Sequence, residues 1–437
     1  MKRTVGVILI GAACAGCARP VDEILPTASS PAASEPAPQP APGDWPWWRG
    51  TLVDGKGTGN SPPVNWSETE NVQWKVAVPG RGHASPIVWG NLVFVATADD
   101  RAQTQSLVCL DLTTGRPQWT REIHRGGFVS INEKNSHASA TPVCDGQRIY
   151  VAILVQDALW VSAVGPDGKI QWQTAAGPFQ SRHGYGSSPA VFGSLVIVCG
   201  DNEKSGFLAA LDRATGKIVW RVRRPNASSY ATPIVAQVAG RPQLLLSGAG
   251  IVASHDPATG RRLWHCQGPA ETTANTAAYD ESHVYASGGY PDKEIMCIRA
   301  DATGDADVSD SHVVWRSRQG VAYVPSPLLH NGLLFVMSDN GVLSCFDAKT
   351  GHVVWKERLE GNFSSSPILA GHILFVSNET GTTYVLRAAP QFKLTAANEL
   401  DDGGLASPVA CDGRLLLRGS HSLYCIGASL AGGISSE

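Results

Sequence analysis

One short turn sequence constrains this chain more than any other feature. The pattern Asp-x-x-Thr-Gly occurs four times, and a tryptophan follows eight residues after each Asp. Asp accepts hydrogen bonds from turn amides, and Gly tolerates the positive φ that such turns need. The Trp that follows has a large apolar face to bury against a neighbour. The four turns lie at 111–115, 212–216, 256–260 and 347–351, and their tryptophans are Trp119, Trp220, Trp264 and Trp355.

The sequence around each turn predicts a four-stranded unit. Residues 326–355 show it most clearly, because four runs rich in Leu, Val and Phe are separated by Gly, Asn and Asp. Such runs between turn residues are typical of an antiparallel meander. A unit of this kind that repeats about every 40–45 residues indicates a blade of a β-propeller. Trp172 and Trp315 occupy the same place behind altered turns.

The first strands of the blades can be counted from a second pattern, Ser-Pro or Thr-Pro. Eight first strands are expected on this basis, and the fifth has Ala277 where the others have Pro. The seventh blade has no Trp, and Leu394 lies near the expected place. The predicted starts are Ser85-Pro86, Thr141-Pro142, Ser188-Pro189, Thr232-Pro233, Thr276-Ala277, Ser326-Pro327, Ser366-Pro367 and Ser407-Pro408.

The two ends of the repeat region complete one another. Residues 72–78, which include Trp74, resemble a fourth strand with no first three, whereas 405–426 contain the first three strands only. Pairing them closes the ring and removes a free sheet edge. The sequence therefore predicts an all-β fold, an eight-bladed propeller of four-stranded antiparallel blades closed by an N-terminal strand.

The repeat resembles the pyrroloquinoline-quinone-type propeller repeat, and the resemblance covers about 72–427. That superfamily contains quinoprotein dehydrogenases and also non-catalytic propellers, including the lipoprotein of the outer-membrane β-barrel assembly machinery. The fold does not decide between these classes, so the site must.

The N-terminus predicts export. Lys2 and Arg3 precede a short apolar run, which is typical of a signal peptide. The residues before Cys17 resemble a bacterial lipobox, in which this Cys becomes the lipidated N-terminus; the alternative is an ordinary secretory signal. We expect a lipoprotein at the periplasmic face of the outer membrane. The expected segments are a signal peptide (1–16), a Pro/Ala/Ser-rich tether (17–43), an extension packing on the propeller (44–71), the propeller (72–427) and a C-terminal tail (428–437).

Motifs for catalysis are missing from the sequence. It has no Cys-Cys pair of the alcohol-oxidising quinoproteins and no C-x-x-C-H haem motif. The acidic stretch 304–310 lacks the Gly and Glu of an EF-hand loop, so a solvated insertion is the better interpretation. We expect no metal and no cofactor; pyrroloquinoline quinone and calcium belong to the alternative, a dehydrogenase. The third-strand cysteines Cys109, Cys297, Cys345 and Cys425 are expected to be free buried thiols, as are Cys144 and Cys411.

Residues before the first strands should gather at one mouth of the central channel, joined by the turns 201–204 and 290–293. A mouth of this composition suits an anion, a peptide strand or a sugar, although Tyr and His that merely fill the channel would give the same pattern. The candidate ligand-binding residues are Arg81, His83, His137, Arg182, His183, Tyr185, Tyr230, Asn275, Tyr323, Asn362 and Phe363.

A binding or assembly scaffold is the function these patterns favour, with another cell-envelope protein or peptide segment as partner and the membrane reached through the N-terminal lipid. The net charge of −3 and the lack of basic runs argue against nucleic acid. A monomer is expected. The alternatives are a quinoprotein dehydrogenase or a propeller that binds a carbohydrate or peptide at the channel mouth.

Overall fold

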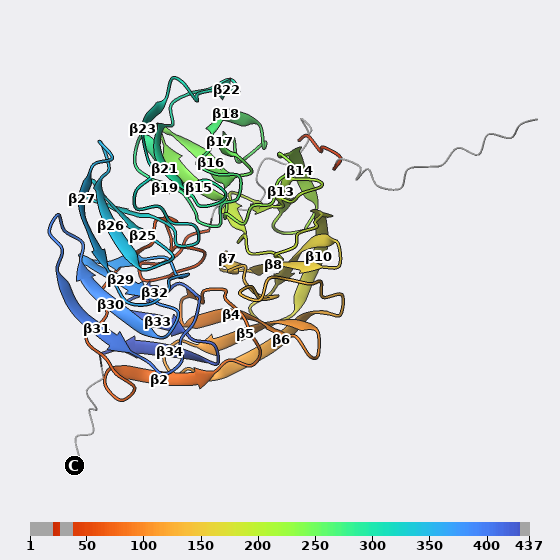
Figure 1. Cartoon of the computed structure of the whole chain (residues 1–437). Coiled ribbons are helices and arrows are strands. Elements are labelled where there is room, and N and C mark those ends of the chain that lie inside the picture. Colours follow the sequence, from red (N-terminus) through yellow and green to blue (C-terminus); the bar gives the residue numbers. More distant parts are fainter. Residues whose placement is uncertain (1–20, 27–37, 429–437) are drawn as a thin grey trace, which may run out of the picture.

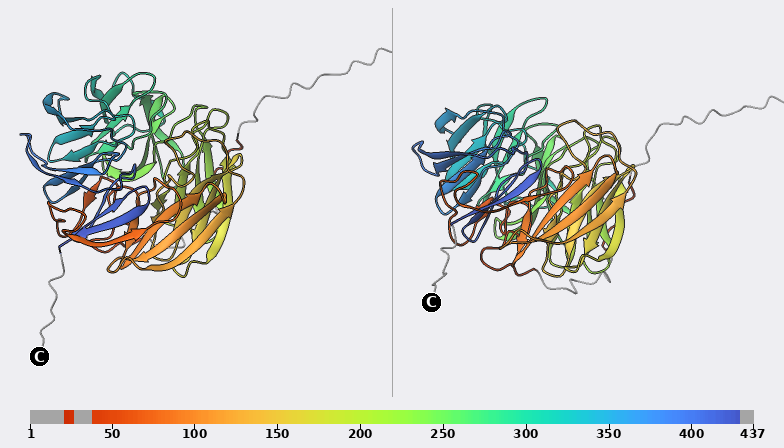
Figure 2. Two further views of the ribbon diagram at one scale, coloured as in Figure 1. Left: turned by 60° about the horizontal axis from the view of Figure 1, so that its bottom comes forward. Right: turned by 90° about the horizontal axis from the view of Figure 1, so that it is seen from below.

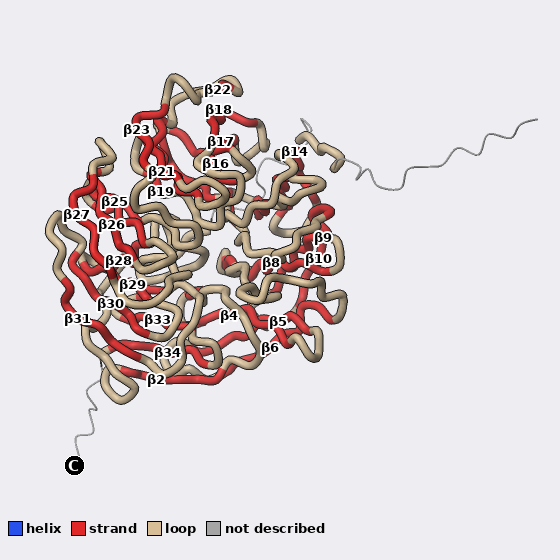
Figure 3. The backbone as a smooth tube through the Cα atoms, viewed as in Figure 1, coloured by secondary structure: helices blue, strands red, loops and turns tan. Residues whose placement is uncertain are grey.

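The computed structural model describes residues 21–26 and 38–428, and all regular structure in these ranges is β. Eight sheets stand around a common centre as the blades of a ring, which confirms the predicted eight-bladed propeller (Figure 1). Figure 2 shows the ring tilted and from its side, and Figure 3 shows that loops fill much of the central region. The described residues contain no helix long and apolar enough to cross a membrane.

Each blade is an antiparallel meander whose first strand lies at the centre of the ring. Blade 1 contains β3 (Ile87–Trp89), β4 (Leu92–Asp99), β5 (Thr104–Asp111) and β6 (Pro117–Arg125). Blade 2 contains β7 (Val143–Cys144), β8 (Ile149–Val155), β9 (Ala158–Val164) and β10 (Ile170–Pro178). Blade 3 contains β11 (Ala190–Phe192), β12 (Leu195–Cys199), β13 (Phe207–Asp212) and β14 (Ile218–Arg223). Blade 4 contains β15 (Ile234–Val238), β16 (Arg241–Gly248), β17 (Ile251–His255) and β18 (Arg262–Gln267).

The second half of the ring repeats this order. Blade 5 contains β19 (Ala278–Tyr279), β20 (His283–Gly288), β21 (Glu294–Arg299) and β23 (Val313–Ser317). Blade 6 contains β24 (Leu328–His330), β25 (Leu333–Met337), β26 (Val342–Asp347) and β27 (Val353–Arg358). Blade 7 contains β28 (Ile368–Ala370), β29 (Ile373–Ser377), β30 (Thr382–Arg387) and β31 (Leu394–Glu399). Blade 8 contains β32 (Val409–Cys411), β33 (Arg414–Arg418), β34 (Ser422–Gly427) and β2 (Val72–Ala77).

The ring is closed by the N-terminal strand, as predicted. Strand β2 pairs antiparallel with β34, and Trp74 lies opposite Cys425. The Trp74 ring then docks on blade 1, where its Nε1 donates to the Leu112 carbonyl at 2.8 Å. The last blade is therefore built from both ends of the described chain.

The repeated turn works as its chemistry predicts. In blade 1 the Asp111 Oδ1 accepts from both the amide and the hydroxyl of Thr114, each at 2.8 Å. Gly115 has φ 70°, and a Cβ there would lie 2.7 Å from the Trp74 ring. The glycine is thus required both by the backbone and by the tryptophan of the preceding blade. The same close approach joins Trp119 to Gly168, Trp172 to Gly216, Trp220 to Gly260 and Trp315 to Gly351.

The residues opposite these tryptophans are small, which explains the third-strand cysteines. Cys109 faces Trp119, Cys297 faces Trp315 and Cys345 faces Trp355. The prediction of free buried thiols is confirmed for the described part of the chain: the cysteines at 109, 144, 199, 266, 297, 345, 411 and 425 are all buried and unbridged.

Blade 7 breaks the tryptophan pattern for a structural reason. Its register places Ala396, not Leu394, opposite the third strand at the Trp position. A Trp there would dock on the turn between the third and fourth strands of blade 8, but that junction is split between Gly427 and Asn71, which belong to opposite ends of the propeller. A hydrogen bond of 2.9 Å from the Gly427 amide to the Asn71 carbonyl joins the two ends where a continuous turn would otherwise run.

Trp66, from the N-terminal extension, occupies the space that this exception leaves. Its ring lies 6.2 Å from that of Phe375 in the second strand of blade 7. The same separation is 6.0 Å for Phe94 and Trp119 in blade 1 and 6.0 Å for Phe335 and Trp355 in blade 6. Asn398 fixes the segment, because its Oδ1 accepts from the Trp66 amide at 3.1 Å. Trp66 thus substitutes for the missing blade residue.

Three short segments add to the outer or inner edges of blades. Residues 21–26, within the predicted tether, lie along β14 through paired hydrogen bonds between Ile24 and Arg221, and Val21 is buried there. Strand β22 (Ala306–Asp307) runs parallel to β18 as a short fifth strand of blade 4, while Asp305, Asp307 and Asp310 of the acidic insertion are exposed to solvent, as predicted. Strand β1 (Lys56–Gly57) pairs with β28 of blade 7.

Candidate functional site

The N-terminal extension crosses one end of the central channel. Trp45 forms a β-bridge with Val88 of blade 1, and the Pro46 carbonyl accepts from the Cys144 amide of blade 2 at 2.8 Å. On the opposite side of the ring, the buried Arg49 guanidinium donates to the carbonyls of Pro327 at 2.9 Å and Pro367 at 3.3 Å. These contacts lie on the inner strands of four blades, so the extension bridges the ring from within.

Trp48, in the middle of this segment, forms the floor of the channel. Its Nε1 donates to the Thr276 hydroxyl at 2.8 Å, which fixes the orientation of the indole ring. Above it is a cavity of about 640 Å³. This volume falls within the roughly 300–1,000 Å³ that is usual for small-ligand sites. We call this cavity the well, and its end near Lys134 and Glu379 the mouth.

Hydroxyl groups encircle the well at the level where the first strands begin. The backbone amide of one blade's Ser or Thr donates to the side-chain hydroxyl of the next, for example from Thr141 to Ser188 at 2.9 Å. Between Thr232 and Thr276 no such bond occurs, and Trp48 uses the Thr276 hydroxyl instead. The remaining links are Ser85 to Thr141, Ser188 to Thr232, Thr276 to Ser326, Ser326 to Ser366 and Ser366 to Ser407, at 2.8–3.0 Å.

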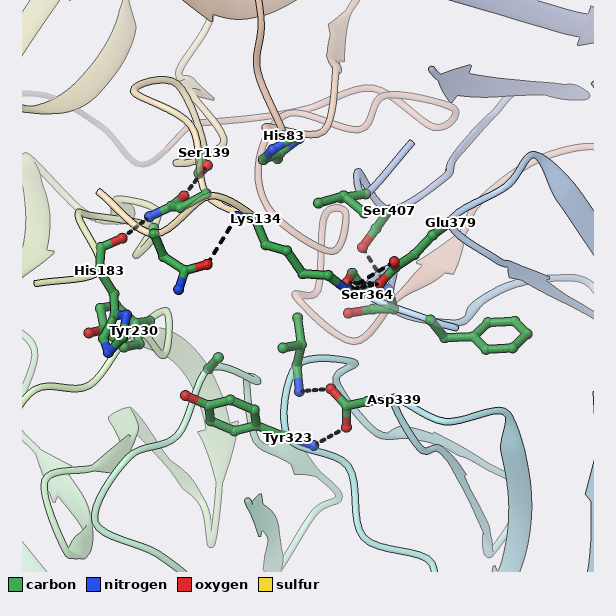
Figure 4. A pocket seen from close by; sticks show the side chains of 18 of the residues that line it. His83, Lys134, Ser139, His183, Tyr230, Tyr323, Asp339, Ser364, Glu379 and Ser407 are labelled. Atoms are coloured by element: carbon green, nitrogen blue, oxygen red, sulfur yellow. Dashed lines mark hydrogen bonds and ion pairs between the residues drawn. The ribbon is translucent and has the colours of Figure 1, made fainter. Parts of the chain in front are cut away.

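An ion pair spans the mouth of the well. Lys134, from the loop between β6 and β7, reaches Glu379 in the turn between β29 and β30, with Nζ 3.1 and 3.0 Å from the two carboxylate oxygens (Figure 4). Glu379 also accepts from the Ser364 hydroxyl at 2.7 Å. The Lys134 side chain is 63% exposed and that of Glu379 only 18%. The Glu379 carboxylate is thus held by two donors, the Lys134 ammonium and the Ser364 hydroxyl, and is the more buried partner of the ion pair.

Asp339 is the second carboxylate on the wall, and two backbone amides donate to it. Its two oxygens accept from the amides of Tyr323 at 2.8 Å and Val324 at 3.0 Å (Figure 4). The aspartate thereby fixes the segment that carries the Tyr323 ring. Close packing helps, since a Cβ on Gly289 would lie 2.3 Å from the Tyr323 Cβ.

Three ring side chains of the well, those of His83, Tyr230 and Tyr323, have shifted pKa values that keep them uncharged at neutral pH. Burial, reinforced by Arg81 and Arg418, lowers the pKa of His83 to about 4. Burial raises the pKa of Tyr323 to about 12, and it raises that of Tyr230 as well. The Tyr230 hydroxyl lies 3.1 Å from the Ser181 hydroxyl, and its ring contacts that of His183 edge-on.

Six of the candidate residues predicted from the sequence line the well, and five do not. The six are His83, His183, Tyr230, Tyr323, Asn362 and Phe363. The other five are Arg81, His137, Arg182, Tyr185 and Asn275, each of which lies near a first strand but outside the cavity.

Most of the side chains outside the well hold loops or the core. His137 uses both ring nitrogens, at 3.0 Å from Asp100 Oδ1 and 3.0 Å from the Val129 carbonyl. Tyr185 is buried and donates to the Cys199 carbonyl at 3.2 Å. Asn275 is fully buried against the carbonyls of residues 322 and 323.

The two arginines lie toward the surface near the mouth. Arg81 donates to the Glu133 carbonyl, which positions the loop that carries Lys134. Arg182 is exposed. Neither arginine lines the cavity, so these two side chains do not supply the basic groups that were expected at the mouth.

Lys134, Asp339, Glu379 and Trp48 are wall residues that sequence reasoning did not select. Asp339 and Glu379 lie in turns between second and third strands, which were expected at the mouth, but on blades 6 and 7 rather than on blades 3 and 5. In blade 3 the corresponding Asp201 is buried in an ion pair with Arg224, with Oδ2 2.8 Å from Nη2. No repeat signal marks Trp48 or Lys134.

Two features of the well bear on the quinone and calcium of the dehydrogenases. A quinone with several carboxylates needs unpaired cations, whereas Lys134 is paired with Glu379 and the wall also holds Asp339. Calcium takes about 6–8 oxygen ligands. Within the described ranges, no group of three or more His, Cys, Asp and Glu side chains is arranged to hold a metal ion.

The sequence matches the family model described as outer membrane protein assembly factor BamB, over residues 57–125, 103–311 and 299–390. The chain belongs to this family. The matched stretches together span almost the whole ring, which confirms the predicted repeat family and its relation to the assembly-machinery lipoprotein. No curated protein sequence matches the chain.

Solved structures share the fold of this BamB-family chain at low identity. BamB from Moraxella catarrhalis is 13% identical with a TM-score of 0.56, covering 81% of this chain and 98% of that one. The quinohemoprotein alcohol dehydrogenase from Comamonas testosteroni is 11% identical with a TM-score of 0.61, covering 90% and 82%. A europium-containing methanol dehydrogenase is 12% identical with a TM-score of 0.61, covering 88% and 98%.

Proposed function

We propose that this BamB-family propeller is an exported, non-catalytic scaffold of the cell envelope that binds another envelope protein at the mouth of the well. In this proposal Cys17 carries the lipid, and the scaffold serves the assembly of outer-membrane proteins. The observation that carries the proposal is the family match over 57–390. Cys17 lies outside the described residues, so its lipidation rests on the sequence alone.

The chemistry of the well supports binding rather than catalysis. A general base or nucleophile needs an available acidic or basic group near the reacting atom. Here Glu379 is neutralised by Lys134, and each oxygen of Asp339 already accepts from a backbone amide. Burial keeps the described cysteines protonated, since the pKa of Cys109, for example, is raised to about 12.

Site-specific photo-crosslinking in solubilised membranes tests the docking face. A photoreactive residue at Asn132, exposed at the mouth, should give an adduct with an envelope protein, identified by mass spectrometry. The matched control is Lys349, exposed in the Asp-x-x-Thr-Gly turn at the opposite end of blade 6. Equal labelling from both positions, or adducts only from Lys349, would refute docking at the mouth.

Two further measurements separate this proposal from its alternatives. Purified protein with pyrroloquinoline quinone and Ca²⁺ should not oxidise alcohols or aldoses with an artificial electron acceptor, and quinone-dependent turnover would favour a dehydrogenase. Mass spectrometry of the mature N-terminus should find an acylated Cys17. An unmodified N-terminus would indicate a soluble exported protein instead.

A further inference from the structure

We propose that the well below the mouth binds a short neutral saccharide. This inference rests on the proposed function, because it names the ligand class of the same binding face: the protein partner contacts the rim, and the saccharide occupies the cavity of about 640 Å³ beneath it. The argument depends on which polar groups of the well are already paired and which are not.

The charged groups of the well are paired within the protein. Lys134 and Glu379 neutralise one another, and Ser364 adds a further donor to the carboxylate. Asp339 accepts from two backbone amides. A phosphate or carboxylate ligand would need an unpaired cation, and an amine would need an unpaired carboxylate. An anionic ligand would therefore have to displace Glu379 from Lys134, and a cationic ligand would have to compete with two backbone amides for Asp339.

Several uncharged polar groups of the well have no hydrogen-bond partner within the described part of the protein. Nε2 of His83 is buried and has no hydrogen-bond partner, and the low pKa of this side chain, about 4, keeps the ring neutral. Within the described part of the chain, the Asn362 carboxamide and the Tyr323 hydroxyl also make no hydrogen bond. All three residues line the well. They offer donors and acceptors without charge, which is what ligand hydroxyl groups require.

Aromatic rings supply the other half of a saccharide site. Trp48 forms the floor in a fixed orientation, and Tyr230 and Tyr323 stand on the wall, whereas the Phe363 ring is buried in the core. A pyranose ring presents an apolar face of C–H groups and an edge of hydroxyls. Pockets of this kind combine aromatic surface with a few placed polar groups. The hydroxyls of Ser139, Ser188 and Thr232 add polar contacts around the rings.

Isothermal titration and tryptophan fluorescence of the full chain test the inference. The neutral probes are cellobiose and N,N′-diacetylchitobiose, and the charged probes are glucuronic acid and glucosamine. We expect saturable binding of a neutral probe, with a change in Trp fluorescence, and weaker binding of both charged probes. Asn362→Ala and Tyr323→Phe should each weaken the neutral probe about fivefold, the effect of one lost hydrogen bond.

Gln319→Ala is the matched control for Asn362→Ala. Gln319 is an exposed carboxamide in the segment before blade 6 and does not line the well, so this variant should bind as the wild type does. Thermal melts of all variants establish that they are folded. Equal weakening by Gln319→Ala would show that the probe binds elsewhere and would overturn the assignment.

The remaining outcomes distinguish this inference from the proposed function. Preferred binding of glucuronic acid would overturn it in favour of an anion site. If neither neutral probe binds while the Asn132 crosslink to an envelope protein still forms, the saccharide site is wrong and the scaffold stands. If a neutral probe binds but no crosslink forms, the saccharide site stands and docking at the mouth is wrong.

Discussion

Replacing Trp66 with two different residues tests whether the N-terminal extension completes blade 7. Trp66 is 4% exposed and packs on the fully buried Phe375. Truncating a buried Trp to Ala costs about 3–5 kcal/mol of the free energy of unfolding. We expect Trp66→Ala to fall in this range, although the residue lies outside every repeat.

The phenylalanine substitution separates Trp66 from the blade tryptophans. Nε1 of Trp66 is buried without a hydrogen-bond partner, so Trp66→Phe removes no bond and should cost about 1 kcal/mol or less. In contrast, Nε1 of Trp74 donates to the buried Leu112 carbonyl at 2.8 Å. Trp74→Phe leaves that carbonyl unsatisfied and should cost about 1–3 kcal/mol more than Trp66→Phe.

Urea denaturation followed by circular dichroism measures the free energy of unfolding of these three variants. A double-mutant cycle with Phe375→Ala isolates the contact between the two rings, for which we expect a coupling energy of about 0.5–1.5 kcal/mol. If Trp66→Ala unfolds at the wild-type urea concentration, or the cycle shows no coupling, Trp66 does not substitute for the missing blade residue.

Three other predictions concern closure, pH and thiols. Trp74→Ala should destabilise the protein by about 3–5 kcal/mol, as much as Trp220→Ala, and thermal melts that leave the first variant unchanged would contradict ring closure. Burial, with a contribution from Arg224, lowers the pKa of His255 from 6.5 to about 3. As the pH falls, the unfolded chain protonates His255 before the folded protein does. The stability that the neutral ring contributes is therefore complete above about pH 6.5 and is lost towards pH 3, by up to about 1.4 kcal/mol per pH unit. In urea titrations at several pH values, His255→Gln should flatten this dependence of the free energy of unfolding on pH, and an unchanged dependence would assign it to other groups. The described cysteines should resist a thiol reagent at pH 8 until denaturant is added, and peptide mapping that finds Cys109 labelled in the native protein would contradict their burial.

The fold is predictable from the sequence because each blade solves the same local problem with the same residues. Asp111, Thr114 and Gly115 make one turn through contacts within five residues, and the Trp that follows docks on an equivalent turn. Such short-range chemistry leaves a repeated pattern in the sequence. Even the closing strand is recognisable, since Trp74 lies in a run that matches the fourth strand of a complete blade.

The well is only partly predictable, because position in a repeat does not determine where a side chain points. Residues before a first strand do lie near the mouth, but Tyr185 turns into the core while Tyr323 turns into the cavity. The difference depends on tertiary neighbours, such as Asp339 holding the backbone of Tyr323. Lys134 comes from a long irregular loop, and its partner Glu379 is 245 residues away in sequence.

The missing tryptophan of blade 7 follows from where the ring is closed. Because the ring closes within blade 8, the turn on which a blade 7 tryptophan would dock is split, so Ala396 replaces that tryptophan and Trp66 packs in its place. The same extension must first cross the ring to reach blade 7, and it does so along the inner strands, with Trp48 at the floor of the channel. The same extension therefore leads into β2, which closes the ring, and places Trp48 at the floor of the channel. The ligand proposed for the well would then reach it at the mouth, beside the ion pair between Lys134 and Glu379.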